Sequence, residues 1–145
     1  MSKLPFVQEL DRLADALADL QALVNRADSK IARELDVGQA HDLQTLRLVN
    51  AASALKVSEI ARRQAVSNAT ASARIDRLER RGFVERLRHD TDRRVVLVHL
   101  TETGRSAARK SVRLRRKVLA QVHDPVGAAD AIDDLLVRYR VHLGT

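Results

Sequence analysis

A short stretch of the chain, residues 64–81, changes its chemistry halfway along. Residues 64–73 carry no charge and are mostly small, whereas residues 74–81 contain four arginines and two acids. Small hydroxyl and amide side chains can approach base edges in a DNA major groove about 12 Å wide, where bulk would hold a helix away. The stretch therefore predicts a DNA-contacting helix whose first turns read bases. The candidate reading residues are Ser67, which we also expect to cap the helix, Asn68, Ala69, Thr70 and Ser72.

The arginines that follow are long enough to reach phosphates beside the groove, and such contacts position a helix without reading sequence. We expect Arg74 and Arg77 to make these contacts in preference to Arg80 and Arg81. The alternative is that some of them are ordinary surface residues. Asp76, for example, stands four positions before Arg80 and can form an ion pair with it.

A second cationic site is predicted at the polar hexapeptide HDTDRR, residues 89–94. Arg93 and Arg94 end this segment, and a guanidinium on a hairpin tip can enter a narrow, electronegative minor groove. An exposed arginine pair without a partner is the alternative. Weaker candidates for phosphate contacts are Lys56, Ser58 and His89, the last with a purely solvent-exposed role as its alternative.

The positive charge of the chain is concentrated in its middle. The net charge is +7 over 145 residues, yet residues 1–55 and 118–145 are each slightly acidic at −2. Residues 56–94 carry +5 and residues 95–117 carry +6. Such a basic belt favours a polyanion, because each neutralised phosphate releases counterions. A solvated arginine-rich surface is the alternative, and acidic lipid is disfavoured because no stripe of large apolar residues accompanies the charge.

The composition argues against several other classes of function. The chain has no cysteine, and its five histidines show no metal-binding spacing, so we expect no metal. It contains neither a glycine-rich phosphate loop nor a nucleophile motif, so we expect no cofactor and no enzymatic activity. The N-terminus lacks a signal-peptide core and no uncharged run approaches the roughly 20 residues that span a bilayer. We therefore expect a cytoplasmic protein without a membrane partner.

The first helix must extend beyond a single small domain. Apolar residues recur from residue 6 to residue 31 at alternating spacings of four and three, which is a heptad seam on a helix about 40 Å long. We expect this helix to pack partly against a second copy of the chain, and burial within its own chain is the alternative. The predicted dimer contacts are Phe6, Leu10, Leu13 and Leu17.

The elements that position the reading stretch are predicted to be two short helices before it and a hairpin after it. Asp36 followed by Gln39 predicts the cap of a helix over residues 38–50, and another short helix is expected over residues 57–64. In the reading helix itself, positions 71, 75 and 78 form one apolar face, and Gly82 ends it.

After Gly82 the apolar period changes from helical to two, which predicts strands over residues 83–88 and 95–100 as the only convincing ones. Thr101 then caps a helix over residues 102–121. Asp124 with Pro125 caps a last helix over residues 126–142.

This order is that of a winged helix-turn-helix, and the chain resembles the MarR family of bacterial transcriptional regulators. The resemblance rests on DRLERRGFVER, DTDRR and LTETG, which end at residues 86, 94 and 104. It implies a homodimer made by the first and last helices, and one wing arginine in the minor groove while Asp90 or Asp92 holds the tip by an ion pair. The chain departs from the family at Ala73, where many relatives have a longer polar residue, and at Gln64-Ala65, which replaces a usual Leu-Gly.

The resemblance also implies a small-molecule effector that binds between the dimer helices and the winged domain and weakens DNA binding. The candidate contacts at that junction are Arg12, His41, Gln44 and Arg47. An ordinary surface or dimer-contact role is the alternative for each of them.

Together these observations predict a mainly α (α+β) fold. We expect an N-terminal dimerisation helix in residues 1–35, a winged helix-turn-helix DNA-binding domain in residues 36–101 and C-terminal dimerisation helices in residues 102–145. The expected function is that of a homodimeric repressor that binds a palindromic operator in double-stranded DNA and is released by a small-molecule effector. The alternatives are a non-specific or architectural DNA-binding protein and a dimeric protein-interaction module.

Overall fold

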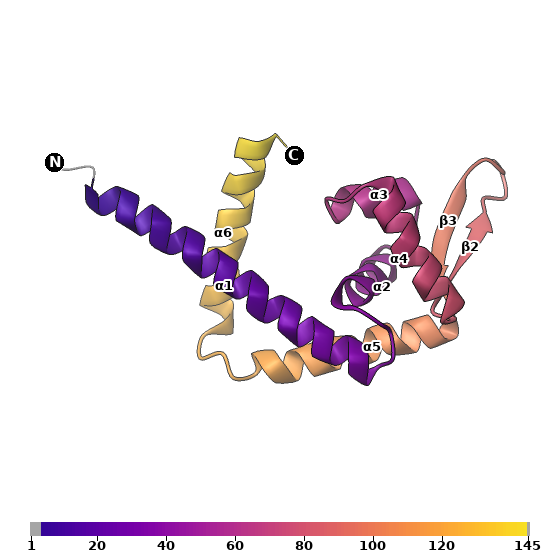
Figure 1. The fold of residues 1–145 in the computed structure, drawn as a ribbon, viewed down its shortest axis with the longest axis horizontal. Helices are drawn as coiled ribbons and strands as arrows, with labels where there is room; N and C mark the ends of the chain where they lie inside the picture. Colours follow the sequence, from indigo (N-terminus) through magenta and orange to yellow (C-terminus); the bar gives the residue numbers. More distant parts are fainter. Residues whose placement is uncertain (1–3, 145) are drawn as a thin grey trace.

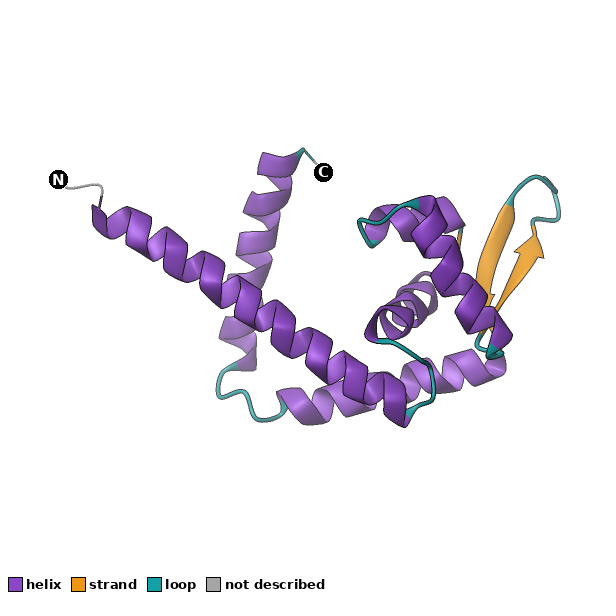
Figure 2. Cartoon of the chain, viewed as in Figure 1, coloured by secondary structure: helices purple, strands orange, loops and turns teal. Residues whose placement is uncertain are grey.

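The structure, a computed structural model, describes residues 4–144 and is mainly helical with one small sheet (Figures 1 and 2). In chain order its elements are α1 (Leu4–Glu34), α2 (Ala40–Ala52), β1 (Ala54–Leu55), α3 (Val57–Arg63), α4 (Asn68–Arg80), β2 (Val84–Arg88), β3 (Val96–Leu100), α5 (Glu102–Leu119) and α6 (Pro125–Leu143). This order confirms the predicted mainly α fold with a winged helix-turn-helix. Within residues 4–144, none of the helices combines the length and apolar character that a bilayer crossing requires.

Three of the predicted helix starts are fixed by their caps. The Ser67 hydroxyl accepts the Thr70 N–H at 3.1 Å, and the Thr101 hydroxyl accepts the Gly104 N–H at 3.0 Å. The Asp124 carboxylate accepts the Gly127 N–H at 3.0 Å. Each bond satisfies one of the backbone donors that the first turn of a helix leaves unpaired, so these starts could be predicted from local sequence.

The predicted cap of α2 was wrong, because Asp36 ends α1 instead of starting α2. Asp36 has a positive φ of 55°, and its N–H donates to the Arg33 carbonyl at 3.2 Å while the Val37 N–H reaches the Ala32 carbonyl at 2.9 Å. These are the two bonds of a Schellman helix end. Gln39 caps α2, and its N–H donates to the carboxylate of Asp42 at 3.3 Å.

The sheet contains one strand more than the sequence predicted. Its order is β1-β3-β2, with both pairs antiparallel. The additional strand, β1, consists of Ala54 and Leu55, which pair with His99 and Val98. Two residues are too few to show the alternation by which strands are recognised in sequence.

The hydrophobic core lies between α2, α4 and the sheet. Its fully buried members include Leu43 and Leu46 of α2, Ile75 of α4 and Val98 of β3. The same core also takes in residues 31 and 32 of α1 and residues 107 and 108 of α5. The core therefore extends across both predicted domain boundaries. The winged part of the molecule, residues 26–117, accordingly includes the end of α1 and the start of α5.

The apolar seam of α1 has two different environments. Ile31 is 4% exposed, whereas Phe6 is 70% and Leu13 is 43% exposed. Figure 1 shows the N-terminal half of α1 (indigo) and all of α6 (yellow) extending away from the winged part. The end of the seam is used by the chain's own core, and the rest of it is left uncovered.

Candidate nucleic-acid interface

The first turns of α4 expose the predicted reading residues. Asn68, Ala69 and Thr70 are exposed, and Ser72 is half-buried. The Ser67 hydroxyl, besides capping the helix, donates to the Thr70 hydroxyl at 3.0 Å. The helix start is therefore fixed by its cap, while the surface it offers is made of small side chains.

Three separate segments converge beside these turns. The start of α3, the start of α4 and the tip end of the wing enclose a surface hollow, and in Figure 1 they lie on the upper side of the winged part with α5 below. The residues that line the hollow are Lys56, Val57, Ser58, Asn68, Ala69, Ser72, Arg94, Val95 and Val96. Every polar residue among them was predicted from the sequence as a DNA contact, and two of them are cationic.

Arg74 does not belong to this surface, so its predicted phosphate contact is wrong. Its side chain is buried, with only 9% of the residue exposed, and it donates to the Gln64 side chain at 3.1 Å. The same Gln64 oxygen accepts the Thr45 hydroxyl at 3.0 Å. Arg74 lies three residues after the buried Ala71 and therefore faces the protein, where its long stem can pack against apolar neighbours.

Arg77 is also held by the protein. Its guanidinium forks onto Asp42 of α2, with Nε 3.1 Å from Oδ2 and Nη2 2.9 Å from Oδ1. The hydrogen bonds to Asp42 raise the pKa of Arg77 above its usual range. The protein itself thus supplies partners for both arginines that were expected to contact phosphate.

The two later arginines of the stretch are more exposed. Arg81 lies 3.1 Å from the carboxylate of Asp36. Arg80 is exposed and, within residues 4–144, forms no ion pair. The predicted pair between Asp76 and Arg80 is absent, because Asp76 accepts instead from Arg86 at 2.7 Å. Arg80 is therefore the arginine of α4 that is best placed to meet a phosphate.

Arg86 of β2 is a structural residue that the sequence interpretation missed. Its guanidinium bonds Asp76 at 2.7 Å and Glu79 at 3.0 Å, and its backbone N–H reaches Glu79 at 3.2 Å. These contacts link the wing to the side of α4 that carries Asp76 and Glu79. The available signal was a cation on the strand directly after a helix that carries two acids.

The tip of the wing is stabilised by Asp92. Its Oδ1 accepts the Arg94 N–H at 3.0 Å and lies 3.2 Å from Nε of the Arg94 side chain. Hydrogen bonds from Arg94 hold the pKa of the Asp92 carboxyl below its usual value. Of the two acids that the resemblance offered, Asp92 therefore makes the ion pair.

The remaining wing residues have local partners or none. The Arg93 carbonyl accepts a bond from Arg88 at 2.7 Å, and the Arg93 guanidinium forms no ion pair within the described residues. The His89 ring bonds the Thr91 hydroxyl at 2.8 Å. His89 is exposed, but its ring is partly engaged within the wing.

The candidate effector contacts lie at the junction of α1 and α2, with one exception. His41 and Gln44 line one hollow there, and Gln44 and Arg47 line a neighbouring one. Arg47 forms an ion pair with the buried Asp28, and Gln44 donates to the same carboxylate at 3.0 Å. Arg12 lies outside this junction within one chain, on the exposed part of α1, where it is 3.5 Å from Glu9.

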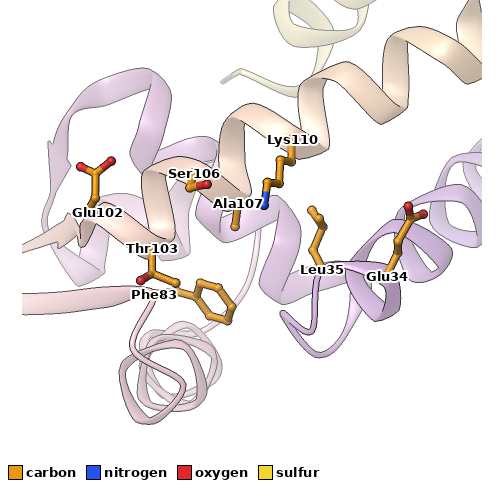
Figure 3. Close-up of a pocket in the computed structure, with 8 residues that line it drawn as sticks. All are labelled: Glu34, Leu35, Phe83, Glu102, Thr103, Ser106, Ala107 and Lys110. Carbon is orange, nitrogen blue, oxygen red and sulfur yellow. The ribbon is translucent and has the colours of Figure 1, made fainter.

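Another hollow lies between the end of α1 and the start of α5 (Figure 3). Glu34 and Glu102 stand at its opposite ends, and Lys110 lies between them. Glu102 is paired with Arg105 at 3.0 Å and with Arg109 at 3.5 Å. Because none of the predicted site residues lines it, this hollow forms no part of the candidate interface.

Comparison with known proteins agrees with this geometry. Residues 39–96, which include α3, α4 and the wing tip, match the model of the MarR family. The chain is 35% identical over 95 residues to PecS, an HTH-type transcriptional regulator of Dickeya dadantii (strain 3937). This alignment covers 61% of this chain and 54% of PecS. It is 40% identical over 67 residues to YfiV, an uncharacterised HTH-type transcriptional regulator of Bacillus subtilis (strain 168). This alignment covers 46% of this chain and 42% of YfiV.

The chain thus spans about half the length of the curated relatives it matches. Its fold is similar to that of Streptococcus pneumoniae FabT, crystallised in complex with DNA, with a TM-score of 0.77 at 22% identity. That similarity covers 93% of this chain and 97% of the FabT chain. The sequence motifs, the matched family model and the shared fold thus agree in their similarity to the MarR family.

Proposed function

We propose that the chain is a dimeric regulator of transcription that binds double-stranded DNA sequence-specifically through α4 and the wing. The observation that carries this proposal is the hollow in which polar residues from three separate segments meet. The start of α4 supplies short groups for base edges, and Lys56 with Arg94 supplies positive charge for the backbone. FabT, which has the same fold, was crystallised with DNA.

The uncovered helices support a homodimer. Phe6, Leu10, Leu13 and Leu17 of α1 are between 37% and 70% exposed, and α6 carries further exposed apolar residues. Exposed apolar surface of this extent marks an interaction site. A twofold dimer would present two α4 helices about 34 Å apart and would therefore read a palindrome.

A repressor role and release by a small anion are the finer parts of the proposal. A dimer seated on a promoter would exclude RNA polymerase. At the junction of α1, α2 and α5, Arg47 and Arg115 both lie near the single carboxylate of Asp28. Burial, together with the like charge of Arg47, lowers the pKa of Arg115. Two guanidiniums beside one carboxylate leave excess positive charge in a partly apolar hollow, which suits an anionic effector.

Selection of DNA by the purified full chain from a random duplex library tests the proposed function. We expect an inverted repeat, bound at least about a thousandfold more tightly than random duplex at the same salt concentration. Binding to both DNAs should weaken as salt rises. Tight, salt-sensitive binding without any enriched sequence would indicate the architectural alternative, and no DNA binding at low salt would reject DNA as the partner.

Two variants separate base reading from backbone contact in the same assay. Ser72→Ala should change the ranking of operator sequences by about 1–3 kcal/mol at the contacted position and leave random duplex binding intact. Arg94→Ala should weaken binding to every duplex if the side chain contacts the DNA backbone.

A reporter gene tests the repressor role. When the selected operator is placed in the promoter of the reporter, expression of the reporter should fall in the presence of the protein.

A further inference from the structure

The recognition helix α4 is tied to every element around it by arginines. Its own Arg74 reaches the end of α3, Arg77 reaches α2 and Arg81 reaches the turn after α1. Arg86 of β2 binds two acids of α4 from the wing side. Of these four links, only the one from Arg77 forks onto a fully buried carboxylate.

That carboxylate belongs to Asp42, which is 1% exposed. It takes both Arg77 bonds, at 3.1 and 2.9 Å, and also the Gln39 N–H at 3.3 Å. A bidentate fork fixes rotation as well as distance. A buried carboxylate also holds its partner strongly, because removing one member leaves an uncompensated charge. Asp42 thus holds α4 in one orientation relative to α2.

The turn between α1 and α2 is shaped around the same carboxylate. Gly38 has a φ of 119°, and a Cβ placed on it would lie 3.0 Å from Oδ2 of Asp42. The neighbouring Arg81 donates to the backbone carbonyl of Asp36 at 3.0 Å. The end of α1, the start of α2 and the second half of α4 therefore meet at one point.

We infer that Asp42 is a positioning residue for DNA recognition, which sets the angle at which α4 meets the bases without touching DNA itself. The inference rests on the proposed DNA-binding function. Arg77 lies nine residues beyond Asn68, about 13 Å along the helix. A tilt of about 10° at the fork would therefore move the reading edge by about 2 Å, enough to break a hydrogen bond to a base.

Two neutral variants and one control on the same helix test this role. The test DNAs are an operator fragment selected by the wild-type chain and a random duplex. Asp42→Asn and Arg77→Gln should each weaken operator binding about tenfold while random duplex binding changes less than about twofold and keeps its salt dependence. Arg80→Gln, at the exposed control position, should weaken both DNAs and reduce the salt slope by about one.

The sign of the Asp42→Asn effect is the sharpest part of the test. This variant makes the protein more positive, so a charge effect alone would tighten binding to all DNA. Weaker operator binding with unchanged random duplex binding instead requires a displaced helix. The double variant should lose no more than the larger single loss, because both changes break one link.

Several outcomes would overturn the inference. Unchanged operator affinity in Asp42→Asn would do so, and so would an Arg77→Gln variant that loses both DNAs and salt slope, since Arg77 would then be a phosphate contact. If Asp42→Asn is unfolded at the assay temperature, Arg77→Lys decides, because it keeps the charge but not the fork. Arg77→Lys should weaken operator binding and leave random duplex binding unchanged. If this variant binds the operator as tightly as the wild-type chain does, the positioning role is refuted. If the wild-type chain selects no operator from the library, the proposed function is rejected instead, and not the role of Asp42.

Discussion

The winged part of the molecule and its helical arms differ in how far their apolar side chains are buried within the chain. The helical arms are residues 4–24 and 118–143. In the winged part the core is closed, and no buried side-chain polar atom among the described residues lacks a hydrogen-bond partner. By contrast, all the exposed large apolar side chains of the described residues except Leu87 lie in residues 6–24 or 118–141.

The difference teaches that one helix can serve two purposes. The last turns of α1 are buried in the winged part, with Ile31 4% exposed, while Leu17 and Leu20 of the same seam are 37% and 44% exposed. A regular heptad pattern therefore does not say whether the partner lies in the same chain. The core of the winged part is closed within one chain, whereas the apolar residues of the arms are left exposed in one chain.

The largest effect should come from a cavity in the closed core. Leu46→Ala in the fully buried α2 position should lower the free energy of unfolding by about 2–5 kcal/mol. Urea unfolding followed by circular dichroism measures this. Leu13→Ala in the arm is the matched control, and its loss should depend on protein concentration. An equal, concentration-independent loss at both sites would abolish the distinction between the two regions.

A charge placed on the arm should affect assembly and leave the winged part folded. Leu13→Glu should convert the proposed dimer to monomer and weaken operator binding at least about a hundredfold, because the second half-site no longer adds avidity. Sedimentation velocity and operator titration measure both effects. Gln8→Glu adds the same charge on another face of α1 and should leave both unchanged. A dimeric Leu13→Glu variant would show that the seam is not the interface.

A smaller effect is expected at the turn of the helix-turn-helix, which carries strain. Ala65 has a positive φ of 53°, a conformation that costs a residue with a Cβ about 1–2 kcal/mol. Ala65→Gly should therefore raise the free energy of unfolding by about 1 kcal/mol, after part of the gain is offset by unfolded-state entropy. Ala73→Gly, inside α4, should lower it by about 1 kcal/mol. The same sign for both variants would contradict this account.

The smallest effect concerns pH and the tip of the wing. Asp92 has a lowered pKa in the folded chain because Arg94 bonds its charged form. Its contribution to tip stability is therefore present above its usual value of 3.8 and is lost as pH falls through the lower folded value. An NMR titration of the Asp92 carboxyl should give a midpoint below 3.8 that rises in Arg94→Ala. An identical midpoint in both proteins would rule out the pair as the cause.

The parts of the fold that could be predicted depend on nearby residues. The caps at Ser67, Thr101 and Asp124 each bond a backbone group three positions away, so a short sequence pattern contains the whole interaction. The hairpin was predictable from its alternating residues and polar tip in the same way. Only β1, with two residues, was too short for such a pattern.

The parts that could not be predicted depend on distant partners. Arg77 and Asp42 are 35 positions apart, and nothing local distinguishes Arg77 from the exposed Arg80. Arg74 follows the apolar face of α4 by helical spacing, yet a charged side chain there was expected to point outward. Sequence spacing shows which face a residue occupies, and only the packed structure shows whether a neighbour can satisfy its charge.

The exposed edge of α4 has a consequence for how such a protein can change over time. Asn68, Ala69 and Ala73 are exposed, and the links that hold the helix use other positions. Substitutions at these three sites by residues other than glycine and proline therefore change the stability of the fold little, since exposed positions away from special features tolerate change. If α4 reads DNA as proposed, operator choice and folding are thus separable traits, and new binding preferences can be acquired or engineered on an unaltered fold.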